Sequence, residues 1–302
     1  MMRSDLKSQQ GFTLIEMIMV IVITGIIGGI VAVFIRAPVQ GYMDSARRAE
    51  ISDVADTALR RLGRDLRTAV PNSVRVAGCG ATPCVEFLPT KTGGRYRVDP
   101  ANGLGGCSAV ANNTLGDALN FDAADACFEV VGSQIALVRG AADDLSDQIV
   151  IGSTQSNGNM PYDNTVSGVR RSYTGATGTQ TAIQITNVQF PASADLPGHR
   201  FEVVPGDQQA VTYACLNASG VDGNGDGAGT LTRYWTYGFN NPQVEPALLG
   251  GMNAILADKV SACNFVYDTS NQRNGLVAVS LTITRSNESV SLYHEIHMNN
   301  IP

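Results

Sequence analysis

The chain has 302 residues, enough for one large domain or two small ones, and it carries a net charge of -6 without any long basic run. This charge balance argues against a basic patch for nucleic acid, so we expect no nucleic acid among the partners. Charged residues make up 16% of the chain, against about a quarter in typical domains, whereas glycine is abundant at 32 residues. Such a composition is typical of an exported protein rich in strands and turns.

A short polar segment opens the chain and ends in Gly11. The next 24 residues, Phe12 to Ile35, contain one ionisable side chain, that of Glu16. Because a helix rises about 1.5 Å per residue, this run can cross a hydrocarbon core about 30 Å thick. A buried core helix is the alternative, but so long an apolar run favours a membrane span. We therefore predict a transmembrane helix over residues 12–35.

The small residue Gly11 lies before the apolar run, whereas a secretory signal peptide has its cleavage site after that run. Cleavage between Gly11 and Phe12 would leave the apolar helix on the mature protein as an anchor. Arg36, Arg47 and Arg48 follow the span, so charge alone does not fix its orientation. All six cysteines lie beyond the span, which favours export of the C-terminal side.

The carboxylate of Glu16 costs about 2.5–3.5 kcal/mol within a membrane helix on insertion scales, which indicates a function. The alternative is that Glu16 reaches the cytoplasmic interface, because it lies one turn from the start of the span.

The run GFTLIE, from Gly11 to Glu16, resembles the class III signal of type IV prepilins and type II secretion pseudopilins. The resemblance implies that a membrane prepilin peptidase cuts after Gly11 and methylates the new N-terminal Phe12. It also implies that Glu16 pairs with the N-terminal ammonium of a neighbouring subunit, which would offset the burial of both charges and fix the axial register. Many major pilins have a proline within the membrane helix, whereas the first proline here is Pro38, so any kink should lie near the membrane surface.

Residues 36–70 are expected to continue the helix in amphipathic form. Apolar residues recur at spacings of three and four at Ile51, Val54, Ala58, Leu62, Leu66 and Ala69. The opposite face carries Arg47, Arg48, Asp53, Asp56, Arg60, Arg64 and Arg67. Asp56 and Arg60 are spaced for an ion pair, and Pro71 should end the helix. We expect the apolar stripe to pack on a sheet that follows.

Residues 71–302 are expected to form a β-rich exported globular domain, which makes the fold class α+β and, by resemblance, pilin-like. The predicted strands are 85–88, 134–138, 148–151, 181–190, 200–204, 209–216, 230–239, 276–285 and 289–298. The last two should form a hairpin, with Val277, Val279, Leu281 and Ile283 on one face. Residues 99–125 and 152–180 are rich in Gly, Asn, Ser and Thr and are predicted to be long loops.

The even number of cysteines indicates an oxidising compartment and up to three disulfides. The simplest expectation joins nearest neighbours as Cys79–Cys84, Cys107–Cys127 and Cys215–Cys263. Free buried thiols are the alternative. A zinc site is disfavoured, because no matching second pair of ligands lies near Cys79 and Cys84.

A loop with Asp222, Asn224 and Asp226 resembles the start of a calcium-binding loop, but its twelfth position is Arg233 instead of Glu. Its flanks are predicted strands, so a solvated hairpin turn is the alternative.

His294 and His297 should face opposite sides of a strand and share no metal. Residues 234–237 include three aromatic side chains that are either a sugar-stacking patch or ordinary packing. Because no catalytic motif occurs, we expect neither an enzyme nor a cofactor other than calcium.

The segments 263–277 and 297–302 resemble the C-terminal part of large minor prepilins of mannose-sensitive haemagglutinin (MSHA) pili. Both resemblances imply a minor pilin that helps to initiate or cap a filament, held in the inner membrane by one span with its C-terminal domain in the periplasm. The implied partners are the prepilin peptidase, other minor and major pilins, the inner-membrane assembly platform and membrane lipid. A type II secretion pseudopilin is the closest alternative, and a tip adhesin is the alternative from another class.

Overall fold

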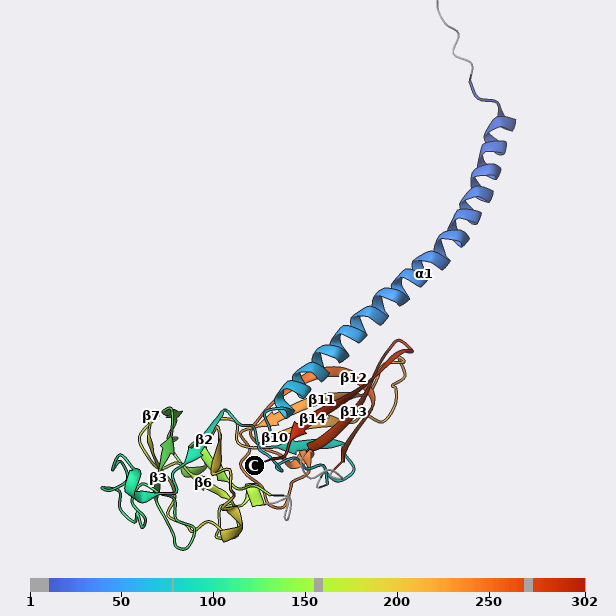
Figure 1. Cartoon of the computed structure of the whole chain (residues 1–302). Helices are drawn as coiled ribbons and strands as arrows, with labels where there is room; N and C mark the ends of the chain where they lie inside the picture. The colour runs from blue at the N-terminus through green and yellow to red at the C-terminus, as the bar shows by residue number, and fades with distance from the viewer. Residues whose placement is uncertain (1–10, 78, 155–159, 269–273, 302) are drawn as a thin grey trace, which may run out of the picture. The chain divides into compact units, whose positions relative to one another are not determined.

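The computed structural model describes residues 11–301 except 78, 155–159 and 269–273. Residues 1–10 of the predicted leader therefore lie outside the described residues. The chain divides into two compact units, Met1–Glu50 and Ile51–Pro302. The long helix α1, Leu14–Leu66, supplies the described helical part of the first unit and the opening of the second. It runs without interruption through Pro38, so the sequence change at the end of the apolar run does not break the helix (Figure 1).

The part of α1 that belongs to the first unit exposes its apolar side chains on every side. Within α1 an 18-residue window has a mean hydropathy of 2.9, and none of that window is buried. By length and composition this is a helix that can cross a membrane. An exposed apolar surface of this extent is stable only against lipid or other apolar surfaces.

The second unit contains a six-stranded antiparallel sheet in the order β1-β10-β11-β12-β13-β14. Its strands are β1 (Cys84–Phe87), β10 (Val211–Leu216), β11 (Gly229–Trp235), β12 (Met252–Asp268), β13 (Asn274–Arg285) and β14 (Glu288–Asn299). β13 and β14 pair over twelve residues, which confirms the predicted C-terminal hairpin. Val277, Val279, Leu281 and Ile283 are all buried, as their alternation predicts.

The C-terminal part of α1 packs on this sheet through the predicted apolar stripe. Ile51, Ala58, Leu62 and Leu66 are buried in one core with side chains from the sheet, and Ala55 and Leu59 widen the stripe. The predicted ion pair is also present, with Arg60 Nε 2.6 Å from Asp56 Oδ2. The α+β fold class with one long N-terminal helix is thereby confirmed.

Residues 88–210 form an insertion between β1 and β10, two strands that pair directly with each other. The insertion builds a second six-stranded sheet in the order β6-β5-β9-β2-β3-β8. Its strands are β2 (Thr92–Tyr96), β3 (Cys127–Val131), β5 (Gln148–Ile151), β6 (Arg170–Ser172), β8 (Ala182–Gln184) and β9 (Arg200–Val204). A further pair joins β4 (Ile135–Leu137) and β7 (Gly178–Gln180), and Figure 1 shows the labelled strands of the insertion gathered on one side of the second unit. Short 3-10 turns occur at Pro100–Asn102, Asp143–Leu145, Met160–Tyr162, Ala192–Ala194 and Pro246–Leu248.

Several predicted boundaries are wrong. The strand expected over 181–190 is limited to β8, and the one expected over 230–239 ends at Trp235. The expected loop 152–180 contains β6 and β7, and β2, β3 and β12 were not predicted. The helix ends at Leu66 instead of at residue 70, because Val70 N already donates to Leu88 O at 2.8 Å and starts a sheet-like contact with the end of β1.

Three disulfides join Cys79 to Cys84, Cys107 to Cys127 and Cys215 to Cys263, with Cα–Cα distances of 5.8, 5.6 and 6.2 Å. These are the nearest-neighbour pairs, and no cysteine is free among the described residues. The second bridge ties the loop at 99–125 to β3, and the third joins β10 to β12. All three lie in the second unit.

Candidate functional site

From Gly11 onward, the chain at the predicted cleavage position is exposed and lies outside the helix. Gly11 to Thr13 precede the first turn of α1, and the side chain of Phe12 is 82% exposed. A Cβ atom added to Gly11 would meet no described atom within 4 Å, so packing does not require glycine at this position. A preference for a small residue here therefore has to come from a partner that handles the segment, such as a peptidase.

The first turn of α1 is capped by Thr13. The backbone N–H of Glu16 donates to Thr13 Oγ1 at 3.4 Å and to Thr13 O at 3.1 Å. The spacing Thr-x-x-Glu is that of a capping box, and a carboxylate in the first turn also interacts favourably with the helix dipole. The Glu16 carboxylate makes no hydrogen bond back to the Thr13 N–H, so only the half of the box supplied by Thr13 is formed.

Local capping leaves the Glu16 carboxylate open to a further partner. Its side chain makes no hydrogen bond or ion pair with any residue that the structure describes. Glycines at Gly25 and Gly29 lie four residues apart on the same helix, and a Cβ at either would meet no described atom. Small residues at this spacing let apolar helices approach closely in a membrane. The surface of this segment is thus suited to helix–helix packing around a buried charge.

The end of α1 is attached to the sheet by a buried polar contact that was also missed. Asp65 Oδ2 accepts from the Tyr213 hydroxyl at 2.6 Å and from Arg233 Nε at 3.1 Å. Arg233 is the residue that occupies the twelfth position of the calcium-like loop. It therefore serves to fix the helix, and its guanidinium also contacts Gln208 Oε1 at 2.8 Å.

The calcium-like loop forms a tight turn whose carboxylates are already engaged. Asp222 Oδ1 accepts from the backbone N–H groups of Asn224 and Asp226 at 2.8 and 2.9 Å. Asp226 accepts from Ser286 N and from Lys259 Nζ, each at 2.7 Å. The Lys259 ammonium already pairs with one of the three expected ligands, Asp226, and no group of three metal-ligating side chains occurs among the described residues, so the calcium site stays a prediction.

The aromatic side chains at the end of β11 make packing and hydrogen-bond contacts, as the packing alternative expects. Tyr234 is buried, and the Tyr237 hydroxyl donates to Glu86 Oε1 at 2.8 Å. Trp235 lies under the guanidinium of Arg233, at 5.0 Å from ring centroid to Cζ. On β14, the partly buried side chain of His294 lies on the face that meets Gly63 of α1. His297 is exposed and lies on the other face of the strand, so the two histidines point away from each other.

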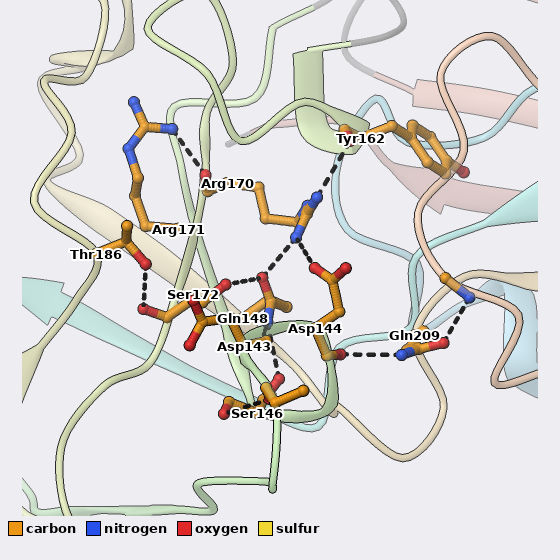
Figure 2. A network of polar contacts seen from close by, with 12 residues as sticks. Asp143, Asp144, Ser146, Gln148, Tyr162, Arg170, Arg171, Ser172, Thr186 and Gln209 are labelled. Carbon is orange, nitrogen blue, oxygen red and sulfur yellow. Dashed lines mark hydrogen bonds and ion pairs between the residues drawn. The ribbon is translucent and has the colours of Figure 1, made fainter.

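A buried polar network lies in the insertion (Figure 2). Arg170 donates to Gln148 Oε1 at 2.6 Å and to Tyr162 O at 3.3 Å, and Ser172 donates to the same Gln148 oxygen. Burial lowers the pKa of Arg170 to about 10, which still leaves it charged at neutral pH. The neighbouring Arg171 is fully buried and donates to four backbone carbonyls. Arg170 Nε is the one donor of these two guanidiniums that is buried without an acceptor among the described residues, and the other donors named here are paired, so we assign this network to the stability of the insertion.

Comparison with known proteins adds one finding. A family model for the prokaryotic N-terminal methylation motif matches residues 6–32. This motif is the processing signal of type IV prepilins and pseudopilins, so the prediction made from GFTLIE is confirmed. No curated protein and no solved structure matches the chain. The motif supports a type IV pilin- or pseudopilin-like protein, a structural class whose members are cut by a prepilin peptidase, assemble with other pilins and are anchored by one apolar helix. The match ends at residue 32, and the C-terminal resemblance to MSHA minor prepilins stays a prediction.

Proposed function

We propose that the chain is a minor type IV pilin of the MSHA type, a structural subunit that helps to initiate or cap the filament. The observation that carries this proposal is the methylation motif at the start of an uncovered apolar helix that continues into a disulfide-bonded domain. Cleavage after Gly11 leaves that helix on the mature chain, where it serves first as an inner-membrane anchor and then as the part that packs in the filament.

The disulfides support a periplasmic position for the second unit. Disulfides form and persist in oxidising compartments, and all three lie after the apolar helix. One span then separates a cytoplasmic leader from a periplasmic domain. In this arrangement the assembly platform and the other pilins are partners in the membrane, and the globular unit contacts them from the periplasmic side.

The insertion between β1 and β10 supports a minor role at the tip. It adds a second sheet to a unit whose core is otherwise α1 and one sheet. A subunit repeated along a shaft has neighbours on all sides, whereas a subunit at the tip leaves room for such an addition. The closest alternative is a minor pseudopilin of type II secretion, because the same motif serves both systems. The insertion also keeps the adhesin alternative open, since it carries surface cavities of its own.

The test is to tag the protein in its native host and to separate sheared filaments from membranes. We expect a small amount of the protein in the filament fraction, at the ends of pili in immunogold images, and the remainder in the inner membrane. Loss of piliation in a deletion strain, with normal secretion by any type II system, supports the pilus over the secretion system. Normal piliation with a secretion defect contradicts the proposal and favours the pseudopilin.

A further inference from the structure

The insertion carries a surface groove that none of the assembly features explains. Two adjoining cavities of about 310 and 420 Å³ share Arg95 and Val131 as lining residues. The larger cavity is also lined by Arg200 and Glu202 of β9. Cavities of this size are within the range that binds small ligands. The residues belong to β2, β3 and β9 of the second sheet, far in sequence from the N-terminal motif.

Two arginines lie next to each other on neighbouring strands that line this groove. Arg95 of β2 and Arg200 of β9 are direct partners in the antiparallel register, and both are exposed. Like charges directly opposite each other on neighbouring strands destabilise a sheet. Neither guanidinium has a hydrogen bond or ion pair to another residue in the described part of the chain. A pair of this kind is suited to an anionic group that bridges both guanidiniums, because Arg binds carboxylates through paired hydrogen bonds.

A carboxylate without a donor lies beside the two arginines. Glu202 Oε2 is buried and has no hydrogen-bond partner among the described residues. Its cross-strand partner is Gly93, which has no side chain, and both residues line the larger cavity, so a small shift of the Glu202 side chain brings its carboxylate into that cavity. A buried acceptor without a partner costs free energy, and a ligand hydroxyl or N–H would remove that cost.

We propose that this groove binds an acidic saccharide. The sugar carboxylate accepts hydrogen bonds from Arg95 and Arg200, and a sugar hydroxyl donates one to Glu202. A ligand with an anionic group alone would leave Glu202 unsatisfied, and a neutral sugar would leave the two guanidiniums unpaired. A carboxylate-bearing sugar supplies both groups within one ring. The exposed side chain of Val131, the partner of Arg95 on β3, offers an apolar contact for the ring on the other side of Arg95. Binding of this kind gives the adhesin alternative a defined site, and it does not depend on filament assembly.

The test uses the full-length protein in detergent micelles and isothermal titration with tetragalacturonic acid. We expect saturable binding that is at least tenfold weaker with the methyl-esterified oligomer, which lacks the charge, and with neutral maltotetraose. Arg95→Gln and Arg200→Gln should each weaken binding at least tenfold, whereas Arg67→Gln, a change at the exposed arginine directly after α1, should leave it unchanged. Equal binding of the charged and neutral oligomers overturns the proposal. Full competition by inorganic phosphate also overturns it, because simple ion exchange then accounts for binding.

Variants at Glu202 separate a binding role from a structural one. Glu202→Leu removes the acceptor and should weaken binding at least tenfold without lowering the thermal stability of the protein, because it replaces an unsatisfied buried group by an apolar one. Glu202→Gln keeps an acceptor oxygen and should restore part of the affinity. If Glu202→Leu binds as tightly as the wild type, the carboxylate does not contact the ligand and the proposed site is wrong.

Discussion

The side chain of Glu16 is a candidate for two different physical roles. Its position three residues after Thr13 has the spacing of a capping box, although its carboxylate makes no hydrogen bond to Thr13 in the structure. Its position inside the apolar run makes it a costly charge that needs a partner. A capping role tolerates glutamine, because the amide can take the place of the carboxylate in the box. A role in binding the N-terminal ammonium of a neighbouring subunit does not, because glutamine has no charge.

We therefore expect Glu16→Gln to be inserted, cleaved and folded like the wild type but to be lost from the filament. Glu16→Leu should behave in the same way, and Glu16→Asp should lie between, since its charge remains with a shorter reach. Each variant is expressed in a strain without the native gene, and sheared filaments and membranes are probed for the protein. If Glu16→Gln enters filaments as the wild type does, capping alone explains the residue and the pairing role fails.

The ion pair between Arg75 and Glu86 is buried where the chain leaves α1 and enters β1. Arg75 Nε lies 2.7 Å from Glu86 Oε2, and the guanidinium stacks over the Tyr162 ring at 3.6 Å. Burial raises the pKa of Glu86, and Arg75 offsets part of that rise. Removal of one partner leaves an uncompensated charge in the interior.

We expect Arg75→Met to lower the free energy of unfolding by about 3–5 kcal/mol. Adding Glu86→Gln to this variant should recover a large share of the loss, because the charge that lacks a partner is then gone. Arg60→Met is the matched control, since Arg60 pairs with Asp56 at the surface and such pairs contribute about 0–1 kcal/mol. Urea unfolding followed by the fluorescence of Trp235, the single tryptophan, measures all three. A loss below about 1 kcal/mol for Arg75→Met would show that water reaches Glu86.

Glu202 gives stability a defined pH dependence. Burial raises the pKa of its carboxyl to about 7 from an ordinary value of 4.5, although Arg200 opposes the rise. The folded protein thus keeps this proton where the unfolded chain has released it, and the contribution of Glu202 to stability falls as the pH rises from about 4.5 to about 7.

Glu202→Gln cannot ionise, so its stability relative to the wild type should increase over this interval, by at most about 3 kcal/mol. The difference should be near zero at pH 4.5 and greatest at pH 8. Glu295→Gln at an exposed position of β14 controls for the general effect of removing a carboxylate. A difference between Glu202→Gln and the wild type that does not vary with pH means that Glu202 ionises normally in the fold.

At the scale of elements, the two halves of α1 differ in what surrounds their apolar side chains. Leu62 lies in the half that packs on the sheet and is fully buried, whereas Ile27 lies in the apolar run and is 55% exposed. Leu62→Ala should lower the free energy of unfolding of the second unit by about 2–5 kcal/mol. Ile27→Ala should leave the Trp235 transition unchanged in detergent, because its side chain touches no part of the sheet core. Equal effects of the two changes would contradict the division of the helix.

The elements predicted from sequence are those whose pattern is local. The 3.6-residue stripe from Ile51 to Leu66 and the alternation from Val277 to Ile283 each report one buried face, and both are confirmed. β12 was missed because most of its side chains are exposed or only partly buried and polar residues interrupt it, as at Asp258 and Lys259. Its 17 residues are held by strands on both sides, which local propensity does not report.

The short strands of the insertion were harder to predict from the sequence than β12. β6 and β7 have three residues each, too few for a period to emerge. β6 also contains two buried arginines, which the sequence pattern places at a surface.

Of the candidate site, Gly11, Phe12 and Glu16 could be predicted directly, because they belong to one contiguous motif. The Arg95–Arg200–Glu202 groove could not, because its members come from two strands that are about a hundred residues apart in sequence.

At the scale of the whole molecule, an anchor-like helix and a disulfide-bonded domain are joined in one chain. The first unit has little that folds by itself in water, and the second has a complete core and all the cysteines. The insertion at residues 88–210 enlarges the second unit without interrupting its first sheet, because β1 and β10 remain paired at the two ends of the insertion. This organisation lets assembly depend on the helix while the insertion is free to acquire a separate binding role.

The central claim, that the apolar helix remains on a processed pilin-like subunit, is tested most directly by the mature N-terminus. The protein is purified from the membranes of its native host, and its N-terminal peptide is sequenced by mass spectrometry. We predict that the chain begins at Phe12 and that its amino group is methylated. A mature chain that begins after Ile35 would show that the apolar run is a removed signal peptide, and it would contradict the account.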